Sequence, residues 1–413
     1  MAIDAGTDML EATPEDVGLS SARLEQVGAL MRRYVDSGRW AGALGAVARH
    51  GRVAYFDTYG ARDAEAGLPM MPDTIFRMAS MTKPIVSVAL MTLFEEARFL
   101  MDTPVAEFLP AFRHPSVFVK GTPERFEVRP AAREITMRDL LTHQSGLTGA
   151  SENTTLGQVY QRADIFGHAE RTLDEVIPKL AELPLACDPG AAFNYGVSTD
   201  VVGYLCEVIS GEPLDVFLQE RIFAPIGMVD TSFHVPPQKR ERFAALYVQG
   251  GENGALRTRN DGPRPNAMYE EGARYLSGSG GLTSTAADYV RFAKMLLNRG
   301  TLDGERIIGP RTLAYMTANH LTGGRDLGDA AVNPLPTWMT HGTGFGLGFA
   351  VLLDPVRANV LGTPGEYYWN GAYSTSFFVS PAEDLVALLM TQLGSSDYQV
   401  RREWRSTVCQ ALV

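Results

Sequence analysis

The stretch Met78-Ala-Ser-Met-Thr-Lys-Pro84 places a serine three residues before a lysine, in a chain that uses lysine sparingly. Arginine supplies most of the 37 basic residues, and lysine occurs only at positions 83, 120, 179, 239 and 294. Arginine stays charged at any pH at which a protein is folded, whereas a buried lysine can lose its proton and act as a base. The composition therefore singles out Lys83 as a candidate base.

An apolar segment rich in helix formers, Ile85–Phe99, follows this stretch, and Pro84 suits the first turn of a helix. Ser80 is therefore predicted at or just before a helix N-terminus, with Lys83 one turn later on the same face. A neutral lysine there could take the serine proton, and the helix start offers a free N–H for an oxyanion. The alternative is that Ser80 only caps the helix and Lys83 is a solvated first-turn residue.

The net charge of the chain indicates which kinds of partner it can bind. The chain has 413 residues, 45% of them hydrophobic, and a formal net charge of −11. Nucleic acids and anionic membranes are bound by basic surfaces, so neither is an expected partner. A small molecule is the expected partner.

Localisation is predicted from segments that the sequence lacks. Residues 1–16 carry no basic start and no apolar stretch, and the longest apolar run, Ile85–Phe94, is far shorter than a membrane span of about 20 residues. The three cysteines are odd in number and irregularly spaced, which indicates reduced thiols and a cytoplasmic protein.

No cofactor or metal is expected. The seven histidines form no HExxH pattern, and the chain has no Gly-rich phosphate loop and no GxGxxG motif after a strand.

Hydrophobic periodicity predicts the order of the elements. A helix is expected over 20–37 and a hairpin over 41–60, with its turn at His50-Gly51; residues 61–77 are loop-like. Short helices and long loops fill residues 100–275. The later elements expected are helices at 199–209 and 285–299, two strands over 367–392 joined at 380–384, and a terminal helix over 398–413.

This order predicts an α/β (α+β) fold in two parts. One α/β domain is assembled from residues 1–99 and 285–413, and residues 100–284 form a mainly helical insertion lobe. Clefts between such lobes are where small-molecule sites form.

Five segments together resemble the class C β-lactamase-like serine hydrolases, which are built from an antiparallel sheet flanked by helices and a mostly helical lobe. They are MASMTKP (78–84), ITMRDLLTHQSGL (135–147), PGAAFNYGVSTDVVGYLCEVISG (189–211), SGSGGLTSTAADYVRFAKMLLNRG (277–300) and YYWNGAYSTSFFVSP (367–381). In that superfamily Ser-x-x-Lys starts a helix, Tyr-x-Asn follows in the helical lobe, and a Lys-Thr-Gly-type triplet lies on a late strand. The resemblance implies that Ser80 is the nucleophile and Lys83 its base.

The chain departs from two of the superfamily motifs, and these differences indicate which group of the superfamily it resembles. The chain has Tyr195-Gly196-Val197 at the Tyr-x-Asn position and Trp369-Asn370-Gly371 at the Lys-Thr-Gly position. Val197 cannot hydrogen-bond through its side chain and Trp369 carries no cation, so both suit a neutral ester better than an anionic β-lactam. The pattern is similar to family VIII carboxylesterases and related acyltransferases.

The resemblance implies the remaining roles. Tyr195 shares the base role and protonates the leaving alcohol. The backbone N–H groups of Ser80 and Ala372 form the oxyanion hole. Trp369, Gly371 and Val197 contribute to the substrate-binding wall.

Other residues have simpler interpretations. His143 is interpreted as a loop histidine that holds a turn, and Asp200 as a first-turn acid of its helix. Gly278, Gly280 and Gly281 could line the cleft or form a flexible turn, and both alternatives stay open. The second Tyr-x-Asn, at 368–370, is out of motif order and is interpreted as a coincidence.

The sequence thus predicts a serine esterase for small to medium carboxylic esters, acting through an acyl-enzyme on Ser80. A β-lactamase, a D-aminopeptidase-like hydrolase or an acyltransferase would use the same acyl-enzyme. A protein of another class, which binds an acyl ligand without turnover, is the third alternative.

Overall fold

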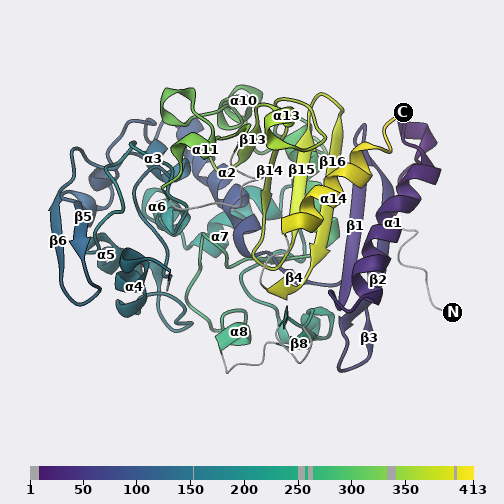
Figure 1. Ribbon diagram of the computed structural model, residues 1–413, viewed down its shortest axis with the longest axis horizontal. Helices are drawn as coiled ribbons and strands as arrows, with labels where there is room; N and C mark the ends of the chain where they lie inside the picture. The colour runs from purple at the N-terminus through teal and green to yellow at the C-terminus, as the bar shows by residue number, and fades with distance from the viewer. Residues whose placement is uncertain (1–8, 152, 250–255, 259–263, 333–340, 395–397) are drawn as a thin grey trace.

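An eight-stranded sheet built from both ends of the chain forms one half of the protein (Figure 1). The structure is a computed structural model that describes residues 9–151, 153–249, 256–258, 264–332, 341–394 and 398–413. Neighbouring strands of the sheet are antiparallel throughout. In spatial order they are β12 (Thr343–Phe345), β13 (Ala350–Leu352), β14 (Tyr367–Asn370), β15 (Ser376–Ser380), β16 (Leu385–Thr391), β1 (Gly42–Arg49), β2 (Arg52–Asp63) and β3 (Leu68–Pro69).

The β1–β2 hairpin turns at the predicted dipeptide. His50 and Gly51 both have positive φ, at 51° and 72°, which is the geometry of the two-residue turns that match the twist of paired strands. Arg49 pairs with Arg52 directly across the turn. The predicted hairpin is therefore confirmed, although β2 runs on to Asp63, into the segment predicted as a loop.

The prediction of two strands over residues 367–392 is wrong, because the segment holds three. A turn over residues 371–375 reverses the chain between β14 and β15, with Ser374 at a φ of 66° and the Gly371 N–H bonded to the Thr375 carbonyl at 2.9 Å. The strong β pattern of YYWNGAYSTSFFVS hides this turn, since only Gly371 marks it. The turn brings Gly371 and Ala372 to the end of the sheet.

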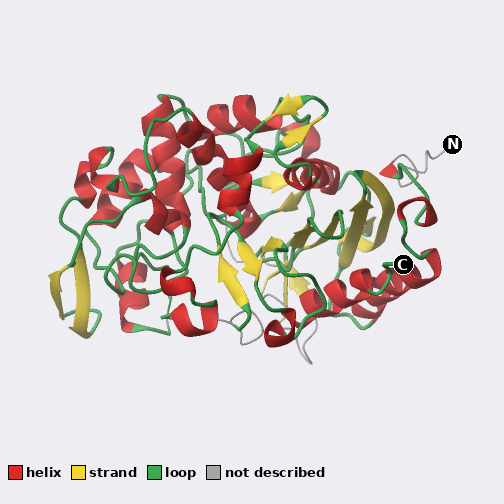
Figure 2. Cartoon of the chain, turned by 90° about the horizontal axis from the view of Figure 1, so that it is seen from above, coloured by secondary structure: helices red, strands yellow, loops and turns green. Residues whose placement is uncertain are grey.

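Helices cover both faces of the sheet. α1 (Ser21–Asp36) packs on β1 and β2 and on α14 (Tyr398–Cys409), whereas α9 (Ala286–Leu297) packs on β1, β15 and β16. A Cβ on Gly45 of β1 would lie 2.6 Å from the ring of Trp404, so glycine permits α14 to approach the sheet. Figure 2 shows the sheet at one end of the molecule and most other helices at the opposite end.

The helical half contains α2 to α7 and a hairpin at its far edge (Figure 1). α2 is buried on all sides and packs on α6, which explains why its sequence is apolar without a polar stripe. The helices are α2 (Thr82–Glu95), α3 (Met137–Leu141), α4 (Thr155–Arg162), α5 (Leu173–Ala181), α6 (Ser198–Ser210) and α7 (Leu214–Leu218), and the hairpin is β5 (Ser116–Gly121) with β6 (Phe126–Pro130). α2 ends four residues before the predicted Phe99, because Ala97 adopts a left-handed φ of 57° and closes the helix.

The remaining elements are short. β4 (Phe76–Arg77) pairs with β9 (Thr283–Ser284) directly before Ser80. The others are β7 (Tyr247–Gln249), β8 (Leu256–Thr258), β17 (Leu393–Gly394), β10 (Thr301–Leu302), β11 (Glu305–Arg306), α8 (Arg264–Ala267), α10 (Pro310–Met316), α11 (Leu327–Ala330) and α13 (Pro355–Ala358). The domain limits at 99/100 and 284/285 stay a prediction. In the part of the chain that the structure describes, no helix is long and apolar enough to cross a membrane.

Candidate active site

Ser80 lies in a single 3-10 turn, Ala79–Met81, between β4 and the start of α2. The N–H of Met78 donates to the Leu282 carbonyl at 2.9 Å, which ties the turn to the strand pair β4–β9. Ala79 has a φ of 46°, a left-handed conformation that is uncommon for alanine and costs energy. The residue before the candidate nucleophile is thus held in a conformation that the surrounding structure must enforce.

Lys83 faces Ser80 from the first turn of α2, as predicted. Its side chain is buried at 4% exposure, and Nζ donates to Ser80 Oγ at 3.3 Å and to the Ser279 carbonyl oxygen at 2.8 Å. The carbonyl therefore holds the amine beside the hydroxyl. This geometry agrees with a serine and its base and excludes the alternative of a solvated lysine.

Tyr195 comes from the segment that precedes α6. The backbone N–H of Asn194 donates to the His143 carbonyl at 2.7 Å, and Asn194 Nδ2 donates to the Leu147 carbonyl at 3.0 Å. These bonds fix the segment on the loop that follows α3. Lys83 Nζ lies 4.8 Å from the centroid of the Tyr195 ring, so the structure brings the three predicted catalytic residues together.

Gly371 brings the end of β14 against the backbone of the nucleophile turn. A Cβ at this position would lie 2.5 Å from the Met78 carbonyl oxygen, so glycine allows the approach. Ala372 follows and is exposed, and Arg401, buried on α14, donates to the Gly371 carbonyl at 2.5 Å. The bond fixes the peptide whose N–H is predicted to serve the oxyanion; that role stays a prediction.

Aromatic rings form a wall beside this group. Trp369 is buried on β14, and its ring centroid lies 5.4 Å from that of Tyr195 and 5.3 Å from that of Phe345. Val197 is half-buried at the N-cap of α6. The structure therefore places Trp369 beside the site, whereas contact of Trp369 or Val197 with substrate stays a prediction.

Tyr368, the residue before Trp369 on β14, makes its contacts away from the site. Arg405 lies over the ring of Tyr368 at 4.9 Å, and the Tyr368 hydroxyl lies 3.4 Å from that of Thr343. These contacts on the sheet agree with the interpretation of Tyr368-Trp369-Asn370 as a coincidence.

His143 holds a turn, as predicted, and also contacts the site. It has a φ of 54° two residues after the end of α3, and its ring centroid lies 4.7 Å from that of Tyr195. Burial, with a smaller contribution from the Lys83 charge, lowers the pKa of His143 well below its ordinary value, so the ring is neutral. The sequence did not predict its place behind Tyr195.

Asp200 lies in the first turn of α6, as predicted, and is buried at 2% exposure. Its Oδ1 accepts hydrogen bonds from Ser277 Oγ at 2.7 Å and from the Ser279 N–H at 3.1 Å. Burial raises the pKa of Asp200, and the hydrogen bonds and the Lys83 charge oppose that shift. The carboxylate is thus bonded to the turn that supplies the carbonyl partner of Lys83.

The comparisons with known proteins identify the family. The family model described as Beta-lactamase matches residues 27–410. The chain belongs to the β-lactamase family. It is 33% identical to Esterase EstB of Burkholderia gladioli over 399 residues, which cover 91% of each protein.

Two solved structures resemble this β-lactamase family member closely. EstCE1, a hydrolase with promiscuous acyltransferase activity, has a TM-score of 0.79 at 26% identity, covering 94% of this chain and 98% of that one. Simvastatin synthase (LovD) from Aspergillus terreus has a TM-score of 0.80 at 25% identity, covering 94% and 97%. The predicted fold class and the predicted class of serine hydrolase are confirmed, and the two esterase-related proteins agree with the resemblance to family VIII carboxylesterases.

Besides the position of the His143 ring, sequence reasoning missed two groups at the site of this family member. The Ser279 carbonyl is a backbone atom, and the glycine-rich run SGSGG marks only a turn, without indicating what the turn contacts. Arg401 is separated from Gly371 by 30 residues, and no pattern links them. In the described residues, no group of three or more His, Cys, Asp or Glu side chains could hold a metal ion.

Proposed function

We propose that this protein is a serine esterase that hydrolyses small to medium carboxylic esters through an acyl-enzyme on Ser80. The observation that carries the proposal is the position of Lys83 Nζ, 3.3 Å from Ser80 Oγ and held from behind by the Ser279 carbonyl. Hydroxyl nucleophiles need such a neighbouring base. The similarity to an esterase over 91% of the chain supports the same reaction.

The proposed reaction has two steps. Ser80 Oγ attacks the ester carbonyl carbon while its proton passes to Lys83, and the N–H groups of Ser80 and Ala372 stabilise the oxyanion. The tetrahedral intermediate expels the alcohol, which takes a proton from Tyr195. Lys83 then returns its proton to Tyr195, and water attacks the acyl-enzyme carbonyl while giving a proton to the pair Lys83 and Tyr195. The pair passes a proton to Ser80 Oγ as its bond to the acyl carbon breaks, which releases the carboxylic acid and free Ser80.

The surroundings of the site support an uncharged substrate. The rings of Tyr195, Trp369 and Phe345 line one side, and Val197 stands where the β-lactamase motif has an amide. A small-molecule ester in the cytoplasm is accordingly the proposed substrate, and neither a nucleic acid nor a membrane is a proposed partner.

An acyltransferase is the second candidate. The aromatic wall favours an organic alcohol over water as the acceptor of the acyl group, and the printed descriptions of EstCE1 and simvastatin synthase name acyltransferase or synthase activity for those proteins. Adding a primary alcohol to the esterase assay and quantifying the new ester separates the two candidates.

The test is the initial rate of p-nitrophenyl butyrate hydrolysis by the wild type and by Ser80→Ala. The wild type should turn over, and the variant should fall to the background rate while retaining the melting temperature of the wild type. Equal rates would overturn the proposal. A permanent butyryl adduct on Ser80 in the intact mass would instead favour the acyl-binding protein, and higher turnover of a cephalosporin than of every ester tested would favour a β-lactamase.

A further inference from the structure

We propose that Asp200 is a positioning residue that sets the place of the Lys83 amine through the turn Ser277–Ser279. The inference rests on the proposed function, because it concerns the base of that reaction. Asp200 does not touch the reacting atoms in this arrangement, and it acts through a backbone carbonyl.

A short chain of hydrogen bonds links the carboxylate to the amine. Asp200 Oδ1 accepts a hydrogen bond from the Ser279 N–H at 3.1 Å. The Ser279 carbonyl in turn accepts a hydrogen bond from Lys83 Nζ at 2.8 Å. Ser277 Oγ donates to the same carboxylate oxygen at 2.7 Å. Asp200 therefore fixes both ends of a three-residue turn, and the orientation of that turn fixes the carbonyl that Lys83 binds.

Further contacts place the turn between two helices. A Cβ on Gly278 would lie 2.3 Å from the Thr199 carbonyl oxygen, so the turn lies directly on the first turn of α6. The N–H of Gly281 donates to the Ser277 carbonyl at 2.9 Å. The N–H of Leu282 donates to Thr82 Oγ1 at 3.1 Å, which joins the far end of the turn to the start of α2. The carbonyl of Ser279 is thus held between the two helices that carry Asp200 and Lys83.

The burial of Asp200 requires an explanation beyond stability. Asp200 forms no ion pair with any other described residue, although its side chain is almost fully buried. A buried carboxylate without a counter-charge is costly, and such groups cluster at functional sites. The amine of Lys83 is joined to Asp200 through Ser279, whose N–H donates to the carboxylate and whose carbonyl accepts from Nζ, which supports a role connected with Lys83.

The effect on catalysis follows from the flexibility of lysine. The side chain has four rotatable bonds, and a productive base must lie within about 2.6–3.2 Å of the heavy atom that carries the proton. Without a fixed Ser279 carbonyl, Nζ can rotate away from Ser80, and a displacement of about 1 Å can lower a rate about 10²-fold. Substrate binding should change little, because Asp200 is buried behind the turn.

The experiment measures kcat and KM for p-nitrophenyl butyrate with Asp200→Ala, Asp200→Asn and Ser277→Ala. Asp200→Ala removes both hydrogen bonds and should lower kcat about 10²-fold, with KM changed by less than about threefold. Asp200→Asn keeps an acceptor oxygen in the same place and should restore kcat to within about fivefold of the wild type. Ser277→Ala removes one of the two bonds and should lower kcat about threefold to tenfold.

Asp288 provides the matched control. It is equally buried, it occupies the same position in the first turn of α9, and its carboxylate contacts neither the Ser277–Ser279 turn nor Lys83 in the described structure. Asp288→Ala should lower the melting temperature and leave kcat unchanged.

Three outcomes would overturn the inference: wild-type kcat in Asp200→Ala, an Asp200→Asn variant as impaired as Asp200→Ala, or an Asp288→Ala variant with the same loss of kcat. If Asp200→Ala does not fold, Ser277→Ala decides, and an unchanged kcat in that variant counts against the inference. Absence of Ser80-dependent turnover in the wild type would overturn the proposed function, which is a different failure.

Discussion

Asp200 and Asp288 occupy the same local position, the third residue of a helix, in α6 and α9 respectively. Both are buried, and in both burial raises the pKa of the carboxyl. Asp200 receives its hydrogen bonds from the turn that holds Lys83. Asp288 receives its bonds from the Asp230 N–H at 2.7 Å and from Thr231 Oγ1 at 2.8 Å.

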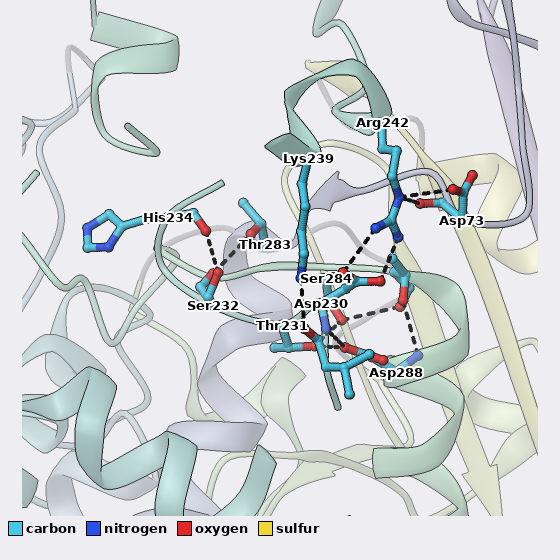
Figure 3. A network of polar contacts seen from close by, with 12 residues as sticks. Asp73, Asp230, Thr231, Ser232, His234, Lys239, Arg242, Thr283, Ser284 and Asp288 are labelled. Carbon is cyan, nitrogen blue, oxygen red and sulfur yellow. Dashed lines mark hydrogen bonds and ion pairs between the residues drawn. The ribbon is translucent and has the colours of Figure 1, made fainter. Parts of the chain in front are cut away.

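The two networks lead to different surroundings, and Figure 3 shows the network around Asp288. Beyond Asp288, the network reaches ion pairs, in which Asp230 contacts Arg242 at 2.6 Å and Lys239 at 2.7 Å, and Thr231 Oγ1 lies 2.7 Å from Ser284 Oγ on β9. Beyond Asp200, it ends at a serine and a lysine that are candidates for catalysis. The local sequence determines that an acid occupies the first turn of a helix, but the loop that packs against that turn determines what the acid does. One network should control stability and the other activity.

The largest expected effect is the difference in kcat between variants of the two lysines, Lys83 in the Asp200 network and Lys239 in the Asp288 network. Lys83→Ala removes the proposed base and should lower kcat about 10³-fold or more, as loss of a member of one catalytic unit does. Lys239→Ala removes the ion pair with Asp230 and should change kcat less than about twofold, with the melting temperature lower by about 2 °C. The measurements are kcat for p-nitrophenyl butyrate and thermal unfolding followed by circular dichroism. Turnover close to wild type in Lys83→Ala would show that another residue is the base.

The sequence predicted those parts of the site that depend on local spacing. Ser80 and Lys83 lie three residues apart at a helix start, so their contact follows from helix geometry alone. The place of Tyr195 followed from the motif order of the resemblance. For the sheet, two β-rich runs that flank His50-Gly51 predicted the β1–β2 hairpin, with that dipeptide as its turn.

The parts that the sequence did not predict depend on contacts between distant segments. The Ser279 carbonyl, the contact of Arg401 with Gly371 and the ring of His143 behind Tyr195 each require the tertiary structure. A backbone carbonyl has no sequence signal, and a buried acid in a first turn looks the same whether it stabilises a helix or holds a catalytic loop. The split of the first of the two strands predicted over 367–392 into β14 and β15 was missed because β-branched and aromatic residues continue through the turn.

An effect of intermediate size is expected on the melting temperature when Asp230, which belongs to the Asp288 network, is replaced. Burial alone would raise the pKa of Asp230, but hydrogen bonds and charges from Arg242 and Lys239 outweigh burial and lower it. Because the pKa in the folded state is lowered, the stabilisation is complete above the ordinary value of 3.8 and is lost as the pH falls through the folded value. Asp230→Asn should therefore melt about 3 °C below the wild type at pH 7, and the difference should shrink as the pH falls below the ordinary value of 3.8.

Melting temperatures of both proteins between pH 2.5 and pH 7 check the prediction, with kcat at pH 7 as the control. A constant difference over the whole range would mean that the hydrogen-bond geometry, rather than the charge of Asp230, stabilises the fold. A loss of kcat in Asp230→Asn would mean that the two networks are coupled.

The smallest effect, and one of opposite sign, is expected for the stability of Asp200→Asn. Burial raises the pKa of Asp200 in the folded state, so its protonated form stabilises the fold at low pH, and that stabilisation is lost as the pH rises through the folded value. Asparagine has no charge to bury, so the variant should melt at or slightly above the wild-type temperature at pH 7 and lose this advantage below the ordinary pKa of 3.8. The same series of melts measures it. A variant that is less stable than the wild type at pH 7, but not at low pH, would show that the Asp200 carboxylate is stabilised in its ionised form. Asp200 would then stabilise the fold through its charge, as Asp230 does. The Asp200 network would in that case control stability as well as activity.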